Sequence, residues 1–92
     1  MARVPESLLH AALCVVAVEL NYSLAKNVRR ERLIRVLRNK LPGHESLARE
    51  ILEELVRQGY LTMHGGRKAY MLTNRGRSQA LKTCKGGSTK LR

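Results

Sequence analysis

The sequence predicts a single α+β domain that is mostly helical, with three helices, a pair of short strands and a last short helix in that order. Three observations lead to this prediction. Apolar residues recur at helical spacing in three segments, a Gly65-Gly66 pair separates two short apolar runs with an alternating pattern, and 92 residues suit one modest core. We expect the domain to cover residues 1–82 and residues 83–92 to form a flexible, basic tail.

The first helix is expected from Glu6 to about Leu20, with Pro5 at a position suited to its first turn. This segment is apolar nearly all round, so it must be covered on more than one side. It is therefore either the central helix of the domain or part of a homodimer seam. Its apolar run is too short to cross a bilayer, and the Pro5-Glu6 pair that precedes it is not typical of a signal peptide. We expect a cytoplasmic protein that makes no contact with a membrane.

The second and third helices are expected over residues 27–41 and 45–58. Asn27 is suited to cap the second helix, and Pro42 and Gly43 end it. Gly59 is suited to end the third helix in a left-handed conformation. Because the link between the two helices is short and contains glycine, the pair is typical of a helix-turn-helix.

A basic stripe lies opposite the apolar face of the second helix. Its members recur at helical spacing or stand in the first turn. They are Arg29, Arg30, Arg32, Arg35, Arg38 and Asn39.

A tight hairpin is expected over residues 60–72, with a two-residue Gly65-Gly66 loop, because glycine accepts the positive φ angles that such turns require. In this register His64 faces Arg67 at the exposed end. Thr73 or Asn74 is then suited to cap a short helix through about Leu81. The alternation places four apolar side chains on one face of the hairpin: Leu61, Met63, Tyr70 and Leu72.

The charge balance points to a polyanionic partner. The chain has 18 Lys and Arg against 7 acidic residues, for a formal net charge of +11, which is more than solubility requires. Nucleic acid is the expected partner, because neutralised phosphates release condensed counterions. With 3 Tyr and no Phe or Trp, the chain has little aromatic surface on which unpaired bases would stack.

Two phrases, LAREILEELVRQGYL and KAYMLTNRGRSQAL, resemble the winged helix-turn-helix superfamily. The likeness lies in a third helix that ends Leu55, Gly59-Tyr60-Leu61, and in a second strand that reads Y-x-L-T-x-x-G-R from residue 70 to residue 77. Regulators of the MarR-like and PadR-like kind carry this closing pattern. The likeness covers about residues 24–82. It implies a three-helix core, a two-stranded β-hairpin wing and a short C-terminal helix.

The resemblance also implies where nucleic acid would be bound. The third helix would be offered to the major groove, and the wing would follow phosphates or the neighbouring minor groove. The candidate contacts are Arg29, Arg30, Arg32 and Arg35 near or on the second helix, Ser46, Arg49, Glu50, Glu53 and Arg57 on the third, and His64, Arg67 and Lys68 at the wing tip.

The third helix departs from the regulator pattern, because its acidic residues outnumber its two arginines. A glutamate in a groove can accept a hydrogen bond from cytosine N4. Alternatively, these glutamates pair with nearby arginines on a solvated face. We interpret Glu54 in the second way and leave both interpretations open for Glu50 and Glu53. If the face is solvated, the second helix, the wing and the tail carry more of the binding.

These observations favour a duplex DNA-binding protein, a small transcriptional regulator or chromatin-associated factor. An RNA- or ribosome-binding protein is the first alternative, since the run SLAREILEELVRQGYL is also similar to the third helix of a winged-helix protein of the archaeal and eukaryotic small ribosomal subunit. A protein-protein assembly module is the second. We expect no enzyme, no cofactor and no small-molecule ligand, because no nucleophile with a matched base and no phosphate-cradling loop is present. A homodimer would use the first or the last helix.

Cys14 and Cys84 are too few for a disulfide framework, and they stand on an apolar helix and in a polar tail. We therefore expect them to be unpaired, in a reducing compartment. His10 and Cys14 are spaced like half of a metal site, but no second half has matching spacing. No metal site is predicted.

Overall fold

The computed structural model describes residues 4–66 and 68–85. The fold is α+β and mostly helical, as the sequence predicts. Its elements are α1 (Glu6–Glu19), β1 (Asn27–Arg29), α2 (Arg30–Lys40), a 3-10 turn (Glu45–Leu47), α3 (Ala48–Arg57), β2 (Leu61–His64), β3 (Ala69–Leu72), α4 (Asn74–Ala80) and a π-helical turn (Leu81–Lys85).

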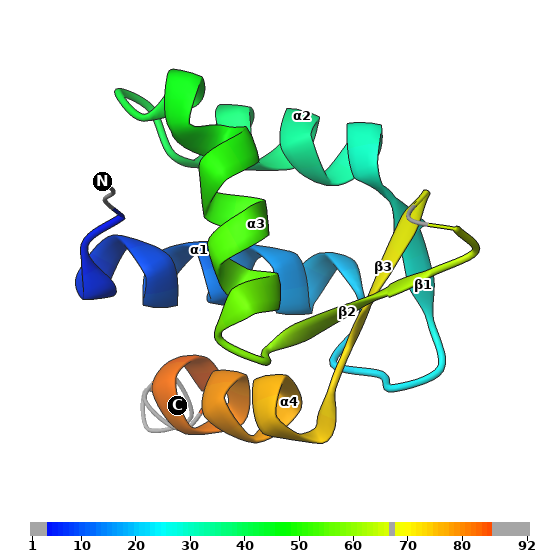
Figure 1. The fold of residues 1–92 in the computed structure, drawn as a ribbon. Helices are drawn as coiled ribbons and strands as arrows, with labels where there is room; N and C mark the ends of the chain where they lie inside the picture. The colour runs from blue at the N-terminus through cyan, green and yellow to red at the C-terminus, as the bar shows by residue number, and fades with distance from the viewer. Residues whose placement is uncertain (1–3, 67, 86–92) are drawn as a thin grey trace.

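Helix α1 is the central helix, which is one of the two positions that its apolar sequence leaves open. It contacts α2, α3 and α4, and Figure 1 shows α2 and α4 on opposite sides of it, with the sheet toward one end. Its buried side chains lie on one face, partly buried side chains flank them, and Val18 stays 60% exposed. Those buried residues are Leu9, Ala12, Leu13, Val16 and Ala17.

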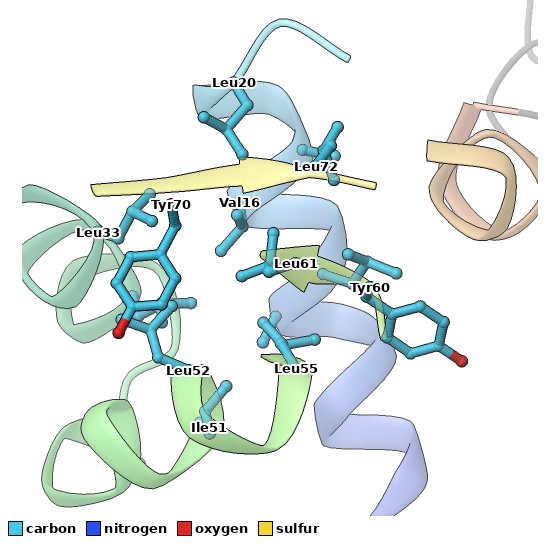
Figure 2. Close-up of a cluster of buried hydrophobic side chains, with 14 of the residues drawn as sticks. Val16, Leu20, Leu33, Ile51, Leu52, Leu55, Tyr60, Leu61, Tyr70 and Leu72 are labelled. Carbon is cyan, nitrogen blue, oxygen red and sulfur yellow. The ribbon is translucent and has the colours of Figure 1, made fainter. Parts of the chain in front are cut away.

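The core lies where α1, α2, α3 and the sheet meet. Figure 2 shows the converging side chains, and most of them are fully buried. Apolar residues at helical spacing supply most of the core. The sheet adds Leu61 of β2 and Tyr70 and Leu72 of β3, whereas Met63 of β2 stays 40% exposed. The labelled members are Val16, Leu20, Leu33, Ile51, Leu52, Leu55, Tyr60, Leu61, Tyr70 and Leu72.

The start of the second helix differs from the prediction. Residues 27–29 form strand β1, which pairs antiparallel with β3, and α2 begins at Arg30 with Arg29 as its N-cap residue. The sheet order is therefore β1-β3-β2. Val28 is 8% exposed and faces the core, opposite Tyr70. Asn27 does not cap a helix because its segment pairs with a strand far along the chain, which local sequence preference does not report.

The register of β2 and β3 also differs from the prediction. His64 lies opposite Ala69, and not opposite Arg67, so four residues rather than two separate the strands. Gly65 and Gly66 do take positive φ angles, 65° and 70°. The observed register places Leu61 opposite Leu72, each 2% exposed. The longer turn thus buries a leucine pair and leaves Lys68 outside the strand. We call residues 65–68 the β2–β3 turn.

The predicted helix ends on either side of α3 are largely confirmed. Gly43 and Gly59 have positive φ angles, 90° and 83°, and Gly59 follows the end of α3 directly after Gln58. The carboxylate of Glu45 accepts hydrogen bonds from the backbone N–H of Gly43, at 3.2 Å to each oxygen. Backbone N–H groups of Glu45 itself and of Gly43 hold the pKa of this carboxyl below its ordinary value. Glu45 therefore shapes the turn between α2 and α3.

The segment 73–76 is fastened to the segment 59–60, and we call this arrangement the C-terminal latch. The Thr73 hydroxyl donates to the carbonyl of Gly59 at 2.5 Å and accepts from the N–H of Gly76 at 3.0 Å, so Thr73 caps α4 as predicted. The backbone N–H of Thr73 donates to the Tyr60 carbonyl at 3.1 Å. A Cβ atom at Gly76 would overlap the same Tyr60 carbonyl. The phrase Y-x-L-T-x-x-G-R is therefore explained, in large part, by packing.

The cysteine prediction is wrong, because Cys14 and Cys84 form a disulfide. The helical segment extends through Lys85, so residues 83–85, which were expected to belong to a flexible tail, form part of the turn that carries Cys84. α4 and this turn run alongside α1 and bring the two cysteines together across 70 residues of sequence. Residues 86–92 of the expected tail lie outside the described residues.

Candidate nucleic-acid interface

The outer surface of α2 has two sides, which the sequence shows only as one stripe. On the side toward α1, the Nε of Arg32 donates to Glu19 Oε2 at 2.7 Å. Val36 and Lys40 continue this side and line an apolar hollow together with residues of α1. Arg32 is one of the predicted nucleic-acid contacts. In the structure it forms an ion pair with Glu19 of α1 and so takes part in the packing of α2 against α1.

The other side of α2 faces the beginning of α3. Arg35 and Arg38 line an open hollow of about 520 Å³ together with Arg49 of α3. Glu31, Ile34 and Asn39 complete its lining. Helical spacing accounts for the first two arginines, and the short turn before α3 brings Arg49 beside them. Three guanidinium groups from two helices thus surround one hollow.

A second hollow, of about 400 Å³, lies where α2 begins. It is lined by Arg29, Arg30, Glu31 and Lys68. The backbone N–H of Arg30 donates to the carbonyl of Lys68 at 3.0 Å, which joins the β2–β3 turn to the first turn of α2. Because Glu31 lines both hollows, they are neighbours on one surface. This juxtaposition depends on the pairing of β1 with β3.

We call the cationic residues of these two hollows the basic surface: Arg29, Arg30, Arg35, Arg38, Arg49 and Lys68. Among the residues that the structure describes, none of these six side chains has a hydrogen bond or an ion pair. Five of them are exposed and Arg30 is half-buried. Apart from Glu31, no acidic residue lines the two hollows in the described chain. The arrangement suits an anion that spans more than one binding position.

The outward face of α3 is more acidic than the basic surface. Glu50, Glu53 and Arg57 are exposed, as the helical spacing predicts, and so is Ser46 of the preceding 3-10 turn. Arg57 forms an ion pair with Glu54, whose other oxygen accepts from the Gln58 side-chain amide at 2.8 Å. The interpretation of Glu54 as an ion-paired residue is confirmed.

Glu50 and Glu53 form no ion pair with a described residue. Glu50 lines a further hollow, together with Ser46, Arg38 and Arg49. The outward face of α3 therefore offers acceptors beside the basic surface. Of the two arginines of α3, Arg49 belongs to the basic surface and Arg57 is paired with Glu54.

The residues predicted at the wing tip are His64, Arg67 and Lys68, and the structure places Lys68 with the other candidate contacts. Lys68 belongs to the basic surface. His64 is exposed at the end of β2, opposite Ala69, and lines neither of the two basic hollows. Arg67 lies outside the described residues.

One member of the basic surface is missing from the predicted contacts. Arg38 lines the larger hollow between Arg35 and Arg49. The sequence does indicate this position, because Arg38 follows Arg35 by three residues and so lies on the same side of the helix, one turn further along.

Two arginines near the C-terminus serve the fold. Arg75 Nε donates to the carbonyl of Gln58 at 2.9 Å, and its guanidinium carbon lies 5.2 Å from the centre of the Tyr60 ring. Arg77 Nε donates to the carbonyl of Tyr22 at 2.8 Å. These contacts place them at the end of α3 and beside the loop after α1, and neither lines the basic surface.

The tyrosines offer little surface for stacking bases. Tyr60 and Tyr70 are 7% and 4% exposed. Tyr22 is partly buried, and this burial raises the pKa of its hydroxyl. All 3 tyrosines of the chain are thereby accounted for, and none is a fully exposed aromatic platform.

Residues 4–66 and 68–85 contain no cluster of three or more His, Cys or Glu side chains that could hold a metal ion. In the same part of the chain, no helix combines the length and the apolar character that crossing a membrane requires. Comparison of the chain with protein-family models, with curated proteins and with solved structures finds no match.

Proposed function

We propose that this chain is a winged-helix protein that binds duplex DNA, as a small transcriptional regulator or a chromatin-associated factor. In this proposal α2 and α3 form the helix-turn-helix, and β2, β3 and the turn between them form the wing. The element order and the antiparallel pairing of β2 with β3 support the assignment.

The observation that carries the proposal is the basic surface. Its six cations come from β1, α2, α3 and the β2–β3 turn, and none forms a hydrogen bond or an ion pair with a described residue. Unpaired cations so close together repel one another, which costs stability unless an anion occupies the surface. A nucleic-acid backbone supplies negative charges at regular spacing and gains free energy when counterions are released.

The outward face of α3 has a complementary role in this proposal. Ser46, Glu50 and Glu53 would meet base edges, and a glutamate there accepts from cytosine N4. Arg49, at the side of this face, would hold the adjoining phosphate and so offset repulsion between the phosphates and the two carboxylates. The acidic residues would then contribute base preference, and the basic surface would contribute affinity.

The test is the salt dependence of binding to a duplex, measured by fluorescence anisotropy over a salt series. The variant Arg35→Ala/Arg38→Ala removes two charges from the basic surface. Because each lost phosphate contact lowers the slope of log K against log salt by roughly 0.9, we expect the slope to fall by about 2.

The matched control is Arg32→Ala/Lys82→Ala, which lowers the net charge equally. Arg32 is paired with Glu19 and Lys82 lies on the C-terminal turn, and both residues are outside the basic surface. We expect the slope to change by less than about 0.5 in this variant. Equal losses in both variants would show that only net charge matters and would contradict the proposed surface.

A competition measurement distinguishes the alternatives. A structured RNA carries the same kind of backbone charge, so the duplex and an RNA hairpin are compared at one salt concentration. Preference for the hairpin would favour a ribosomal or other RNA target. Absence of binding to either at physiological salt would leave an assembly module as the better proposal. Mass in solution, recorded with the same samples, tests the homodimer.

A further inference from the structure

The disulfide joins the first helix to the last helical turn. Cys14 stands on α1 and Cys84 on the turn Leu81–Lys85, and their Cα atoms are 5.8 Å apart. The cross-link closes a loop that contains α2, α3 and the whole sheet. Neither cysteine takes part in the basic surface, so the disulfide is independent of the proposed function.

The C-terminal helical segment is held differently along its length. Its first part, residues 73–77, is held by the C-terminal latch and by the hydrogen bonds of Arg75 and Arg77. In its second part, residues 78–85, Ala80 is buried and Leu81 is half-buried. The Gln79 amide bonds only within this part, to the Thr83 hydroxyl at 2.9 Å. The disulfide is therefore the covalent anchor of the less firmly held part.

Both cysteines are partly exposed rather than buried. Thiol–disulfide exchange requires a thiolate to approach one sulfur along the direction of the S–S bond, so access governs its rate. A disulfide at the end of a short helical segment can gain that access by local fraying, which needs far less free energy than global unfolding.

We propose that Cys14–Cys84 is a redox site that controls the docking of residues 78–85 on α1. A dithiol reductant supplies two electrons and two protons. Its first thiolate attacks one sulfur and releases the other as a thiol, and its second thiol then resolves the mixed disulfide. The products are the thiols of Cys14 and Cys84 and the cyclic disulfide of the reductant. Residues 78–85 then detach, while the latch stays closed.

Reduction also removes a constraint on the unfolded chain. A cross-link across about 70 residues limits the unfolded ensemble considerably in the chain-entropy model. We expect the midpoint of thermal unfolding to fall by about 15–30 °C on reduction, given the sensitivity of domains of this size. The oxidised chain is thus the more stable form.

The experiment is amide hydrogen exchange of the full chain, followed by mass spectrometry, in oxidised protein and in protein reduced with dithiothreitol in the cold. In the reduced chain we expect residues 78–85 to lose nearly all their protection through local opening, while α3 at residues 48–57 stays protected and exchanges only through global unfolding. The variant Cys14→Ala/Cys84→Ala should exchange like the reduced protein and should not respond to dithiothreitol.

Three results would overturn the proposal. The first is two titratable thiols in protein purified without reductant. The second is an unchanged exchange pattern and unchanged unfolding midpoint after complete reduction. The third is residual protection of residues 78–85 that equals that of α3 in the reduced chain, which would make the disulfide a uniform stabiliser and no control of docking. If the double variant does not fold, reduction of the unaltered chain still decides among these results.

Discussion

The basic surface and the C-terminal latch use arginine in opposite ways. Arg35, Arg38 and Arg49 line an open hollow and form no hydrogen bond or ion pair with a described residue. Arg75 and Arg77 donate to backbone carbonyls of Gln58 and Tyr22 and so connect segments that are far apart in sequence. Net charge alone therefore does not locate a binding surface on this protein. What distinguishes a candidate binding arginine from a structural one is whether the fold supplies an acceptor beside it.

The largest expected effect is on the latch. Replacing Gly76 by alanine would place a Cβ atom into the Tyr60 carbonyl, which is backbone and cannot rotate away. We expect Gly76→Ala to lower the free energy of unfolding by about 3 kcal/mol or more, measured by urea denaturation. The control Ser78→Ala, at an exposed site of the same helix, should change it by less than about 0.5 kcal/mol. Equal stabilities of the two variants would refute the close approach.

A smaller loss of stability is expected from Thr73→Val. This change keeps the shape of the side chain and removes both the donor to Gly59 and the acceptor for Gly76. We expect a loss of about 2 kcal/mol in urea unfolding, because a helix cap and a part-buried hydrogen bond disappear together. Thr62→Val, at an exposed position of β2, is the control and should be nearly neutral. A neutral Thr73→Val would mean that packing alone holds the latch.

A pair of arginine variants separates the structural role of the C-terminal latch from the binding role of the basic surface. Arg75→Ala should lower the free energy of unfolding by about 1 kcal/mol, since it loses a hydrogen bond at the end of α3 and a contact with the Tyr60 ring. Its slope of DNA binding against salt should be unchanged. Arg49→Ala should do the reverse, with nearly unchanged stability and a slope lower by roughly 0.9. If the two variants behave alike, the distinction between the two regions fails.

The smallest effect concerns pH and Glu45. Its pKa is lowered by backbone N–H groups, so its contribution to stability is present above the ordinary pKa of the carboxyl and is lost as pH falls through the lowered value. We expect Glu45→Gln to be slightly less stable than the unaltered chain at about pH 7 and equal to it at about pH 2. The measurement is the urea midpoint at both pH values. A difference that persists in acid would assign the effect to shape and not to charge.

Much of the candidate site can be predicted from the sequence, and the rest depends on neighbours. Helical spacing predicts that Arg35 and Arg38 share one side of a helix, and this holds. It does not predict that Arg32 is paired, because Glu19 stands on another helix. Nor does it predict that Lys68 lies beside Arg29 and Arg30, which follows from the pairing of β1 with β3.

The helical segments, the positive φ angles of the glycines, the threonine cap and the excess of positive charge can all be predicted from the amino-acid sequence. These features depend on interactions within a few residues, or on composition alone. Only the tertiary structure decided the strand at residues 27–29, the register that pairs Leu61 with Leu72, the division of the arginines and the disulfide. Each of these joins segments distant in sequence, and the free energy that selects them comes from burying side chains together, which no local pattern records.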